Sequence, residues 1–132
     1  MKILVCEDNP TLRFLYVQWL EGNQFVICEN GTDTVNSAKK ERFDLLILDV
    51  GLPDGDGLDF GLRILNHQPG LSILVVSAHV MHNIQKIDSL KNHKNLKHFD
   101  TIAKGEYVIE KIEAFKIKVW ESLDQGPYKK TS

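Results

Sequence analysis

The chain has 132 residues, of which 42% are hydrophobic and 26% charged, and its formal net charge is −2 at pH 7. This is the composition of one globular domain, and the charge argues against a dedicated nucleic-acid-binding protein. No hydrophobic run reaches the length of a membrane span, and the N-terminal sequence lacks the pattern of a secretory signal, so we expect a cytoplasmic protein that does not contact membranes.

Short hydrophobic runs alternate with helical patterns along the chain. The nearly continuous hydrophobic runs predict buried parallel strands over 3–6, 25–28, 44–49, 71–77 and 99–103. Hydrophobic residues that recur three or four positions apart predict helices over 10–21, 33–42, 58–67, 80–93 and 108–123. A Gly- and Asp-rich stretch after the third strand predicts a tight loop.

This alternation predicts one domain of the α/β class over residues 1–123. Right-handed crossovers between parallel strands place helices on both faces of the sheet, which makes the fold doubly wound. Residues 124–132 carry no hydrophobic pattern, and we expect them to form a flexible tail or the start of a linker.

Polar side chains with related chemistry stand at the ends of the predicted strands. Glu7 and Asp8 follow the first strand, and Asp49 ends the third. Ser77 ends the fourth strand and Lys104 follows the fifth. Ligands of open α/β sheets bind outside the carboxyl ends of the strands, so these residues should meet at one edge.

Crowded carboxylates would take up protons unless they share a cation. Magnesium prefers oxygen ligands and often binds phosphate as well, and a lysine and a hydroxyl suit the remaining phosphate oxygens. This combination predicts phosphoryl transfer through an aspartyl phosphate, with Asp49 as the nucleophile. Taken singly, Asp8 could cap the helix that begins near Pro10, Ser77 could be a plain strand-end hydroxyl, and Lys104 could be a solvated surface lysine.

The chain resembles the receiver domain of bacterial two-component response regulators over roughly residues 2–122. The features that carry the resemblance are, in chain order, Glu7-Asp8, the strand that ends at Asp49, Leu52-Pro53, Asp56-Gly57, Ser77-Ala78 and Lys104. The resemblance implies a flavodoxin-like (βα)5 fold, a five-stranded parallel sheet in the order 2-1-3-4-5. It also implies a signalling phosphoacceptor that is not a turnover enzyme.

By this resemblance, Asp49 accepts a phosphoryl group from a histidine kinase, a phosphotransfer protein or a small donor such as acetyl phosphate. The implied ligands of Mg²⁺, with Mn²⁺ as an alternative ion, are Glu7 through a water, Asp8, Asp49 and the backbone carbonyl of Gly51. Lys104 is implied to hold a phosphate oxygen. Ser77 is implied to move toward the phosphate once Asp49 is modified.

The sequence departs from the family pattern around the switch. Gly105 replaces the usual proline after Lys104, and Thr101 stands where the family usually has an aromatic residue. Phe99 would point to the same face as Thr101 if the strand is regular. Gly51 and His79 occupy the positions that tune dephosphorylation in the family, and Gly51 has no side chain to orient a water, which predicts slow loss of the phosphoryl group.

The resemblance implies several partners and leaves alternatives open. Signal output is expected through the last two strand–helix units, toward a downstream protein, an output domain beyond residue 132 or a second copy of the chain. Direct nucleic-acid binding by this domain is not expected. The main alternative is a degenerate receiver that binds proteins without phosphorylation, which Gly105 and Thr101 favour. An aspartyl-phosphate phosphatase is the weakest alternative, because Gly51 stands where it would need a second acid.

Overall fold

A five-stranded parallel sheet forms the centre of the molecule in the computed structural model, which describes residues 1–78, 84–105 and 107–123. The sheet order is β2-β1-β3-β6-β7, so the predicted order 2-1-3-4-5 and the flavodoxin-like fold are confirmed. The sheet strands are β1 (Lys2–Cys6), β2 (Gln24–Cys28), β3 (Leu45–Leu48), β6 (Leu71–Ser77) and β7 (Leu96–Ala103).

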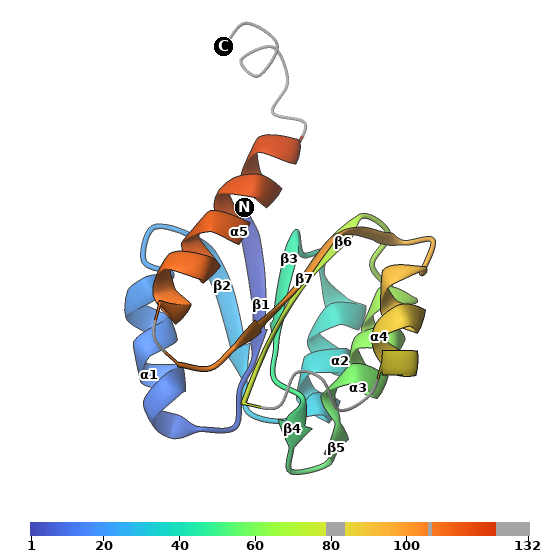
Figure 1. Cartoon of the computed structure of the whole chain (residues 1–132), viewed down its shortest axis with the longest axis horizontal. Helices are drawn as coiled ribbons and strands as arrows, with labels where there is room; N and C mark the ends of the chain where they lie inside the picture. Colours follow the sequence, from blue (N-terminus) through green and yellow to red (C-terminus); the bar gives the residue numbers. More distant parts are fainter. Residues whose placement is uncertain (79–83, 106, 124–132) are drawn as a thin grey trace, which may run out of the picture.

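Helices cover both faces of this sheet (Figure 1). Their bounds are α1 (Pro10–Trp19), α2 (Gly31–Lys40), α3 (Gly57–Leu65), α4 (Ile84–Lys91) and α5 (Val108–Ser122). One hydrophobic cluster joins the sheet to α2, α3 and α4, and the other joins it to α1 and α5. Alternate residues of β3 enter opposite clusters, since Leu46 packs in the first and Ile47 in the second. A sheet buried on both faces requires the continuous hydrophobic strands that the sequence shows.

The loop predicted after the third strand contains a small antiparallel hairpin of β4 (Gly51–Leu52) and β5 (Gly55–Asp56). The intervening Pro53-Asp54-Gly55 sequence is a typical turn signal, and the two short strands that it joins are an addition to the predicted loop. Asp56 caps α3 by accepting a hydrogen bond from Leu58 N at 2.9 Å. The hairpin therefore joins the end of β3 directly to the start of α3.

The start of the last strand differs most from the sequence predictions. The last strand begins at Leu96, three residues before the predicted start, and its register against β6 shifts between the Leu71 and Ile73 pairs. The part of the predicted fourth helix that precedes Ile84 lies outside the described residues, as does the predicted tail 124–132. Over the ranges that the structure describes, none of the helices combines the length and hydrophobicity needed to cross a membrane.

Candidate functional site

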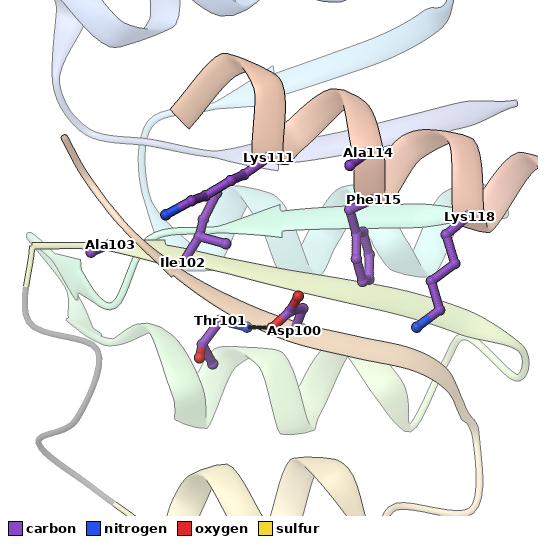
Figure 2. Close-up of a pocket in the computed structure, with 8 residues that line it drawn as sticks. All are labelled: Asp100, Thr101, Ile102, Ala103, Lys111, Ala114, Phe115 and Lys118. Atoms are coloured by element: carbon purple, nitrogen blue, oxygen red, sulfur yellow. Dashed lines mark hydrogen bonds between the residues drawn. The ribbon is translucent and has the colours of Figure 1, made fainter. Parts of the chain in front are cut away.

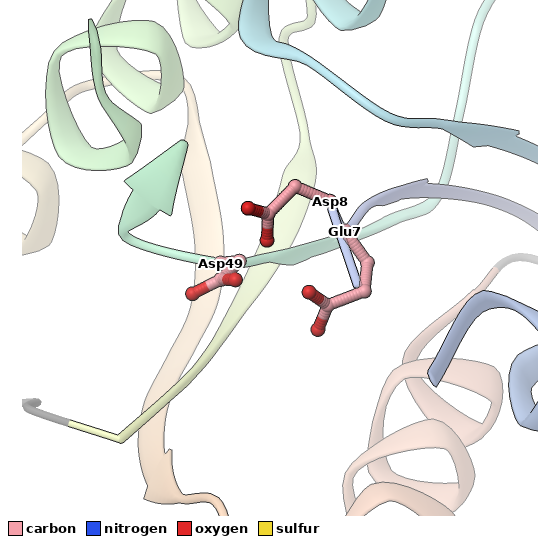
Figure 3. A group of neighbouring side chains, drawn as sticks. All are labelled: Glu7, Asp8 and Asp49. Carbon is pink, nitrogen blue, oxygen red and sulfur yellow. The ribbon is translucent and has the colours of Figure 1, made fainter. Parts of the chain in front are cut away.

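Three carboxylates converge where β1 and β3 end (Figure 3). β1 and β3 are neighbours in register, with Cys6 opposite Leu48, so the residues that follow them emerge side by side. Carboxylate oxygens of Glu7, Asp8 and Asp49 all lie within 4.8 Å of one another. Glu7 and Asp49 are buried, whereas Asp8 is exposed to solvent. The sheet topology thus brings the predicted carboxylates together.

Asp8 does not cap α1, so that alternative interpretation is wrong. The capping residue is Asn9, whose Oδ1 accepts hydrogen bonds from Thr11 N at 2.9 Å and Leu12 N at 3.1 Å. The backbone N–H of Asn9 in turn donates to Glu7 Oε2 at 3.1 Å. Asn9 therefore satisfies the start of the helix and leaves the Asp8 carboxylate available to a ligand.

Lys104 places its ammonium between the two buried carboxylates. Its Nζ lies 3.0 Å from Asp49 Oδ2 and 3.1 Å from Glu7 Oε1. Its backbone N–H donates to the carbonyl of Ser77 at 3.0 Å, which fixes the end of β7 against the end of β6. The side chain of Lys104 is thus held at the nucleophile predicted from the sequence, and it is not a free surface lysine.

The turn after Lys104 has a backbone conformation that excludes proline. Gly105 has φ +158°, far from the value near −65° that a proline ring imposes. Proline, the residue usual in the family at this position, could not adopt this backbone conformation, whereas glycine can. Within this turn, Lys104 still reaches both carboxylates.

Burial and charge perturb the groups at this edge. Burial raises the pKa of Glu7 from 4.5 to about 7, and the neighbouring Asp49 adds to the rise. For Lys104, burial alone would lower the pKa, but hydrogen bonds to Asp49 and Glu7 outweigh it and leave the pKa raised. The ammonium therefore stays charged, while the Glu7 carboxyl holds its charge only at a cost in free energy.

A cleft of about 630 Å³ opens over these groups. Asp8, Asp49, Gly51, Ser77 and Lys104 all line it. The cleft has room for a phosphoryl group beside Asp49, with the Ser77 hydroxyl and the Lys104 ammonium on its walls.

Glycine at position 57 lets α3 begin against the backbone of Asp49. A Cβ added at Gly57 would lie 1.9 Å from the carbonyl oxygen of Asp49, a distance at which no side chain fits. Gly57 N also donates to Val50 O at 2.7 Å. This close approach fixes the segment that follows Asp49 relative to α3.

The donor set at this edge fits a hard divalent cation. All three side chains offer carboxylate oxygens, their spacing allows one ion to touch all of them, and the exposed Asp8 leaves room for waters. Mg²⁺ and Mn²⁺ favour such oxygen ligands. The predicted fourth ligand residue, Gly51, lines the same cleft, and its N–H donates to Asp49 Oδ1 at 3.3 Å.

The predicted switch residues of the last strand do not line this cleft. Thr101 pairs with Val75 and Phe99 pairs with Ile73, so both belong to a regular part of β7 and point to the same face of the sheet. Phe99 packs there against the cluster that includes α3 and α4. His79 lies outside the described residues.

A second hollow, of about 450 Å³, lies between β7 and α5 (Figure 2). Lys111 and Lys118 of α5 and Asp100 of β7 are among the residues that line it. Asp49, Ser77 and Lys104 all line the first cleft, so we assign the chemistry to the strand ends and not to this groove.

Comparisons with known proteins show the family of this chain. The response regulator receiver domain family model matches residues 3–106. The probable transcriptional regulatory protein TcrX of Mycobacterium tuberculosis is 33% identical over 78 residues, which are 58% of this chain and 33% of TcrX. This chain therefore spans about a third of that relative's length.

Solved receiver structures share the fold. A CheY-like receiver domain protein from Methanospirillum hungatei JF-1 superposes with a TM-score of 0.76 at 20% identity, covering 95% of this chain and 98% of that one. The receiver domain of the histidine kinase PA1611 from Pseudomonas aeruginosa PAO1, with magnesium in its active-site cleft, gives 0.71 at 22% identity, covering 92% and 98%. A Burkholderia pseudomallei response regulator with a phosphorylated aspartic acid gives 0.69 at 22% identity, covering 95% and 75%.

Proposed function

The chain belongs to the response regulator receiver domain family, and from this premise we propose that it accepts a phosphoryl group on Asp49 and thereby switches a protein-binding surface. The observation that carries the proposal is the position of Lys104, whose ammonium lies 3.0 Å from Asp49 and 3.1 Å from Glu7. An ammonium at the nucleophile suits the negative charge that a phosphoryl group brings.

The proposed reaction is a displacement at phosphorus. An oxygen of the Asp49 carboxylate attacks, a new P–O bond forms, and the P–N bond of the donor's phosphohistidine breaks. The electron pair of that bond returns to the imidazole, which leaves with a proton from solvent. With acetyl phosphate as donor, acetate is the leaving group. Lys104 holds a phosphoryl oxygen during the transfer, because its raised pKa keeps it charged.

The residues that would hold a magnesium ion are Glu7, Asp8, Asp49 and the backbone carbonyl of Gly51. A bound Mg²⁺ would supply positive charge to the transferring phosphoryl oxygens. The PA1611 receiver domain has a magnesium ion coordinated in its active-site cleft. We extend this binding to the present chain because three carboxylates lie within reach of one ion.

Ser77 is the proposed hydroxyl of the switch. It ends β6, is 5% exposed and lines the cleft. Its Oγ would move toward a phosphoryl oxygen on Asp49 once that residue is modified. Since Thr101 stands where the family usually has an aromatic residue, this movement is not coupled to a ring in the usual way.

We propose a histidine kinase or a phosphotransfer protein as the donor, in the cytoplasm. The signal would pass to a downstream protein, to an output domain beyond residue 132, or to a second copy through the last two strand–helix units. TcrX is a probable transcriptional regulator of about three times the matched length, which supports an attached output domain as one form of this signalling. Direct contact of this domain with nucleic acid or membrane is not part of the proposal.

The phosphoryl group should be lost slowly. Gly51 offers no side chain to orient an attacking water, and a Cβ added there would lie in open space among the residues that the structure describes. Following the phosphorylated protein by mass over time tests this, and a half-life of seconds would contradict it.

The test of the proposal is the intact mass after incubation with Mg²⁺ and acetyl phosphate. The wild type should gain one phosphoryl group and Asp49→Ala none, while Asp88→Ala, which removes an exposed carboxylate of α4, should behave as the wild type. If the wild type gains no mass with acetyl phosphate or with a panel of histidine kinases, the degenerate receiver is the better description.

A further inference from the structure

Arg13 of α1 lies across the turn that carries the acidic pair. Its Nη1 donates to the carbonyl oxygens of Glu7 at 3.1 Å and Asp8 at 2.7 Å. Its Nη2 lies 3.1 Å from Glu29 Oε2, in the segment that follows β2. One guanidinium therefore joins the β1–α1 turn to the β2–α2 turn.

This placement runs against local helix preferences. Arg13 is the fourth residue of α1, and a positive charge near the N-terminus of a helix opposes the helix dipole. Its side chain is 25% exposed, so a long flexible group has also been ordered. A residue placed against local preference suggests a gain elsewhere, and its contacts point to the acidic turn.

The acidic turn needs such support. The carboxylates of Glu7, Asp8 and Asp49 repel one another, and this repulsion favours conformations that separate them. The backbone on the β1 side is held by Glu7 N, which donates to Cys28 O at 3.0 Å. On the α1 side, Arg13 holds the carbonyl groups of Glu7 and Asp8.

We propose that Arg13 is a positioning residue for the cation site. It fixes the peptide units of Glu7 and Asp8 so that their carboxylates remain convergent, and Glu29 holds the guanidinium in place. This inference rests on the proposed function, because it concerns the ion that the carboxylates would bind. Arg13 does not touch the ion or the phosphoryl group; it acts through the backbone.

The shape of the guanidinium is part of the inference. Arginine presents several N–H groups in a planar fork and can serve two carbonyls and one carboxylate together. Lysine has one nitrogen at the end of its chain and cannot span all three acceptors with comparable geometry. Arg13→Lys should therefore restore only part of what Arg13→Met removes.

The experiment is a calorimetric titration with Mg²⁺ on the full chain. Losing groups that orient metal ligands typically weakens metal binding by about 10- to 100-fold, and we expect about tenfold for Arg13→Met. Arg13→Lys should lie between this variant and the wild type, and Glu29→Gln should weaken binding about threefold, as expected for one exposed ion pair. Arg42→Met is the matched control, since Arg42 also donates to a backbone carbonyl, Pro69 O, away from the cleft.

A second readout separates positioning from a general loss of structure. The rate of phosphorylation by acetyl phosphate should require more Mg²⁺ in Arg13→Met but reach the wild-type value at saturation. Far-UV circular dichroism and the thermal midpoint show whether each variant is folded. If Arg13→Met fails to fold, Arg13→Lys and Glu29→Gln test the same contact.

Three outcomes would overturn the inference. Unchanged Mg²⁺ affinity in the folded variants would do so, and so would an equal weakening in Arg42→Met. A lower rate at saturating Mg²⁺ with unchanged affinity would place Arg13 in another role. If the wild type itself binds no Mg²⁺, the proposed function fails first, and this result is distinguishable because it does not depend on any variant.

Discussion

Glu7→Gln should make the cation-free protein more stable at pH 8. Glu7 is 1% exposed, and burial raises its pKa from 4.5 to about 7. In the unfolded chain the carboxyl ionises near 4.5, so the folded state binds more protons between these values. The favourable contribution of the protonated Glu7 to the free energy of unfolding is therefore fully present below pH 4.5. It is lost as pH rises through 7, where Glu7 ionises in the folded protein.

The magnitude follows from the two pKa values. The interval from 4.5 to about 7 at about 1.4 kcal/mol per pKa unit corresponds to about 3 kcal/mol. Glutamine keeps the size of the side chain and an oxygen that can accept from Asn9 N, but it carries no charge. The pKa of about 7 already includes the attraction of Lys104, which opposes the rise, so the expected gain for Glu7→Gln is the whole of about 3 kcal/mol.

The assay is urea unfolding with EDTA at several pH values from 4.5 to 8.5. The difference between Glu7→Gln and wild type should be near zero at pH 4.5 and grow to about 3 kcal/mol above pH 7. Glu121→Gln, at an exposed position of α5, should follow the wild type throughout. Added Mg²⁺ should stabilise the wild type more than Glu7→Gln, because a ligand stabilises the state that binds it. Parallel curves for Glu7→Gln and wild type would refute the reasoning.

Three further substitutions test the fold around the site. Gly31→Ala should lower the free energy of unfolding in urea by about 2 kcal/mol, because overpacking has a cost of this order. The added Cβ would lie 2.1 Å from the Phe60 ring, so adding Phe60→Leu should recover part of the loss. Gln68→Leu should cost about 3 kcal/mol in the same assay, since the buried amide bonds three backbone groups that would lose their partners. Asp54 accepts hydrogen bonds at the start of α2, and these bonds lower its pKa from 3.8 to about 2. The stability that the Asp54 carboxylate contributes is therefore present above pH 3.8 and is lost as pH falls through 2. Asp54→Asn should remove this loss of stability from an acid titration followed by circular dichroism.

The edge that carries the site could be predicted because its position follows from topology. Hydrophobic runs such as the one ending at Leu48 define strands, and parallel strands connected by helices must end at the same edge. The residue after each run is then placed within a few ångströms without further information. For this reason Glu7, Asp8, Asp49, Ser77 and Lys104 were all predicted to meet, and the structure brings them together.

Other features could not be predicted because they depend on tertiary contacts or on which of two neighbouring residues takes a local role. Asp8 and Asn9 are both good capping residues, and only the structure shows that Asn9 caps α1. The early start of β7 at Leu96 depends on its pairing with β6, which no local pattern encodes. The contacts of Arg13 reach back to the turn before its helix, and the one available signal was a cation in an unfavourable part of a helix.

The energetic cost of the acidic edge bears on the choice between an active and a degenerate receiver. Glu7 is buried beside Asp49 at a cost of about 3 kcal/mol above pH 7, which is a large part of the stability of a small domain. A domain that only binds proteins would be more stable with an uncharged side chain at this position. Arg13 opposes its own helix dipole to hold the same turn. Features that lower stability at one edge and converge on one carboxylate are expected at a functional site. We therefore expect phosphoryl transfer to Asp49 to be retained, and we expect the departures at Thr101 and Gly105 to affect the output of the signal.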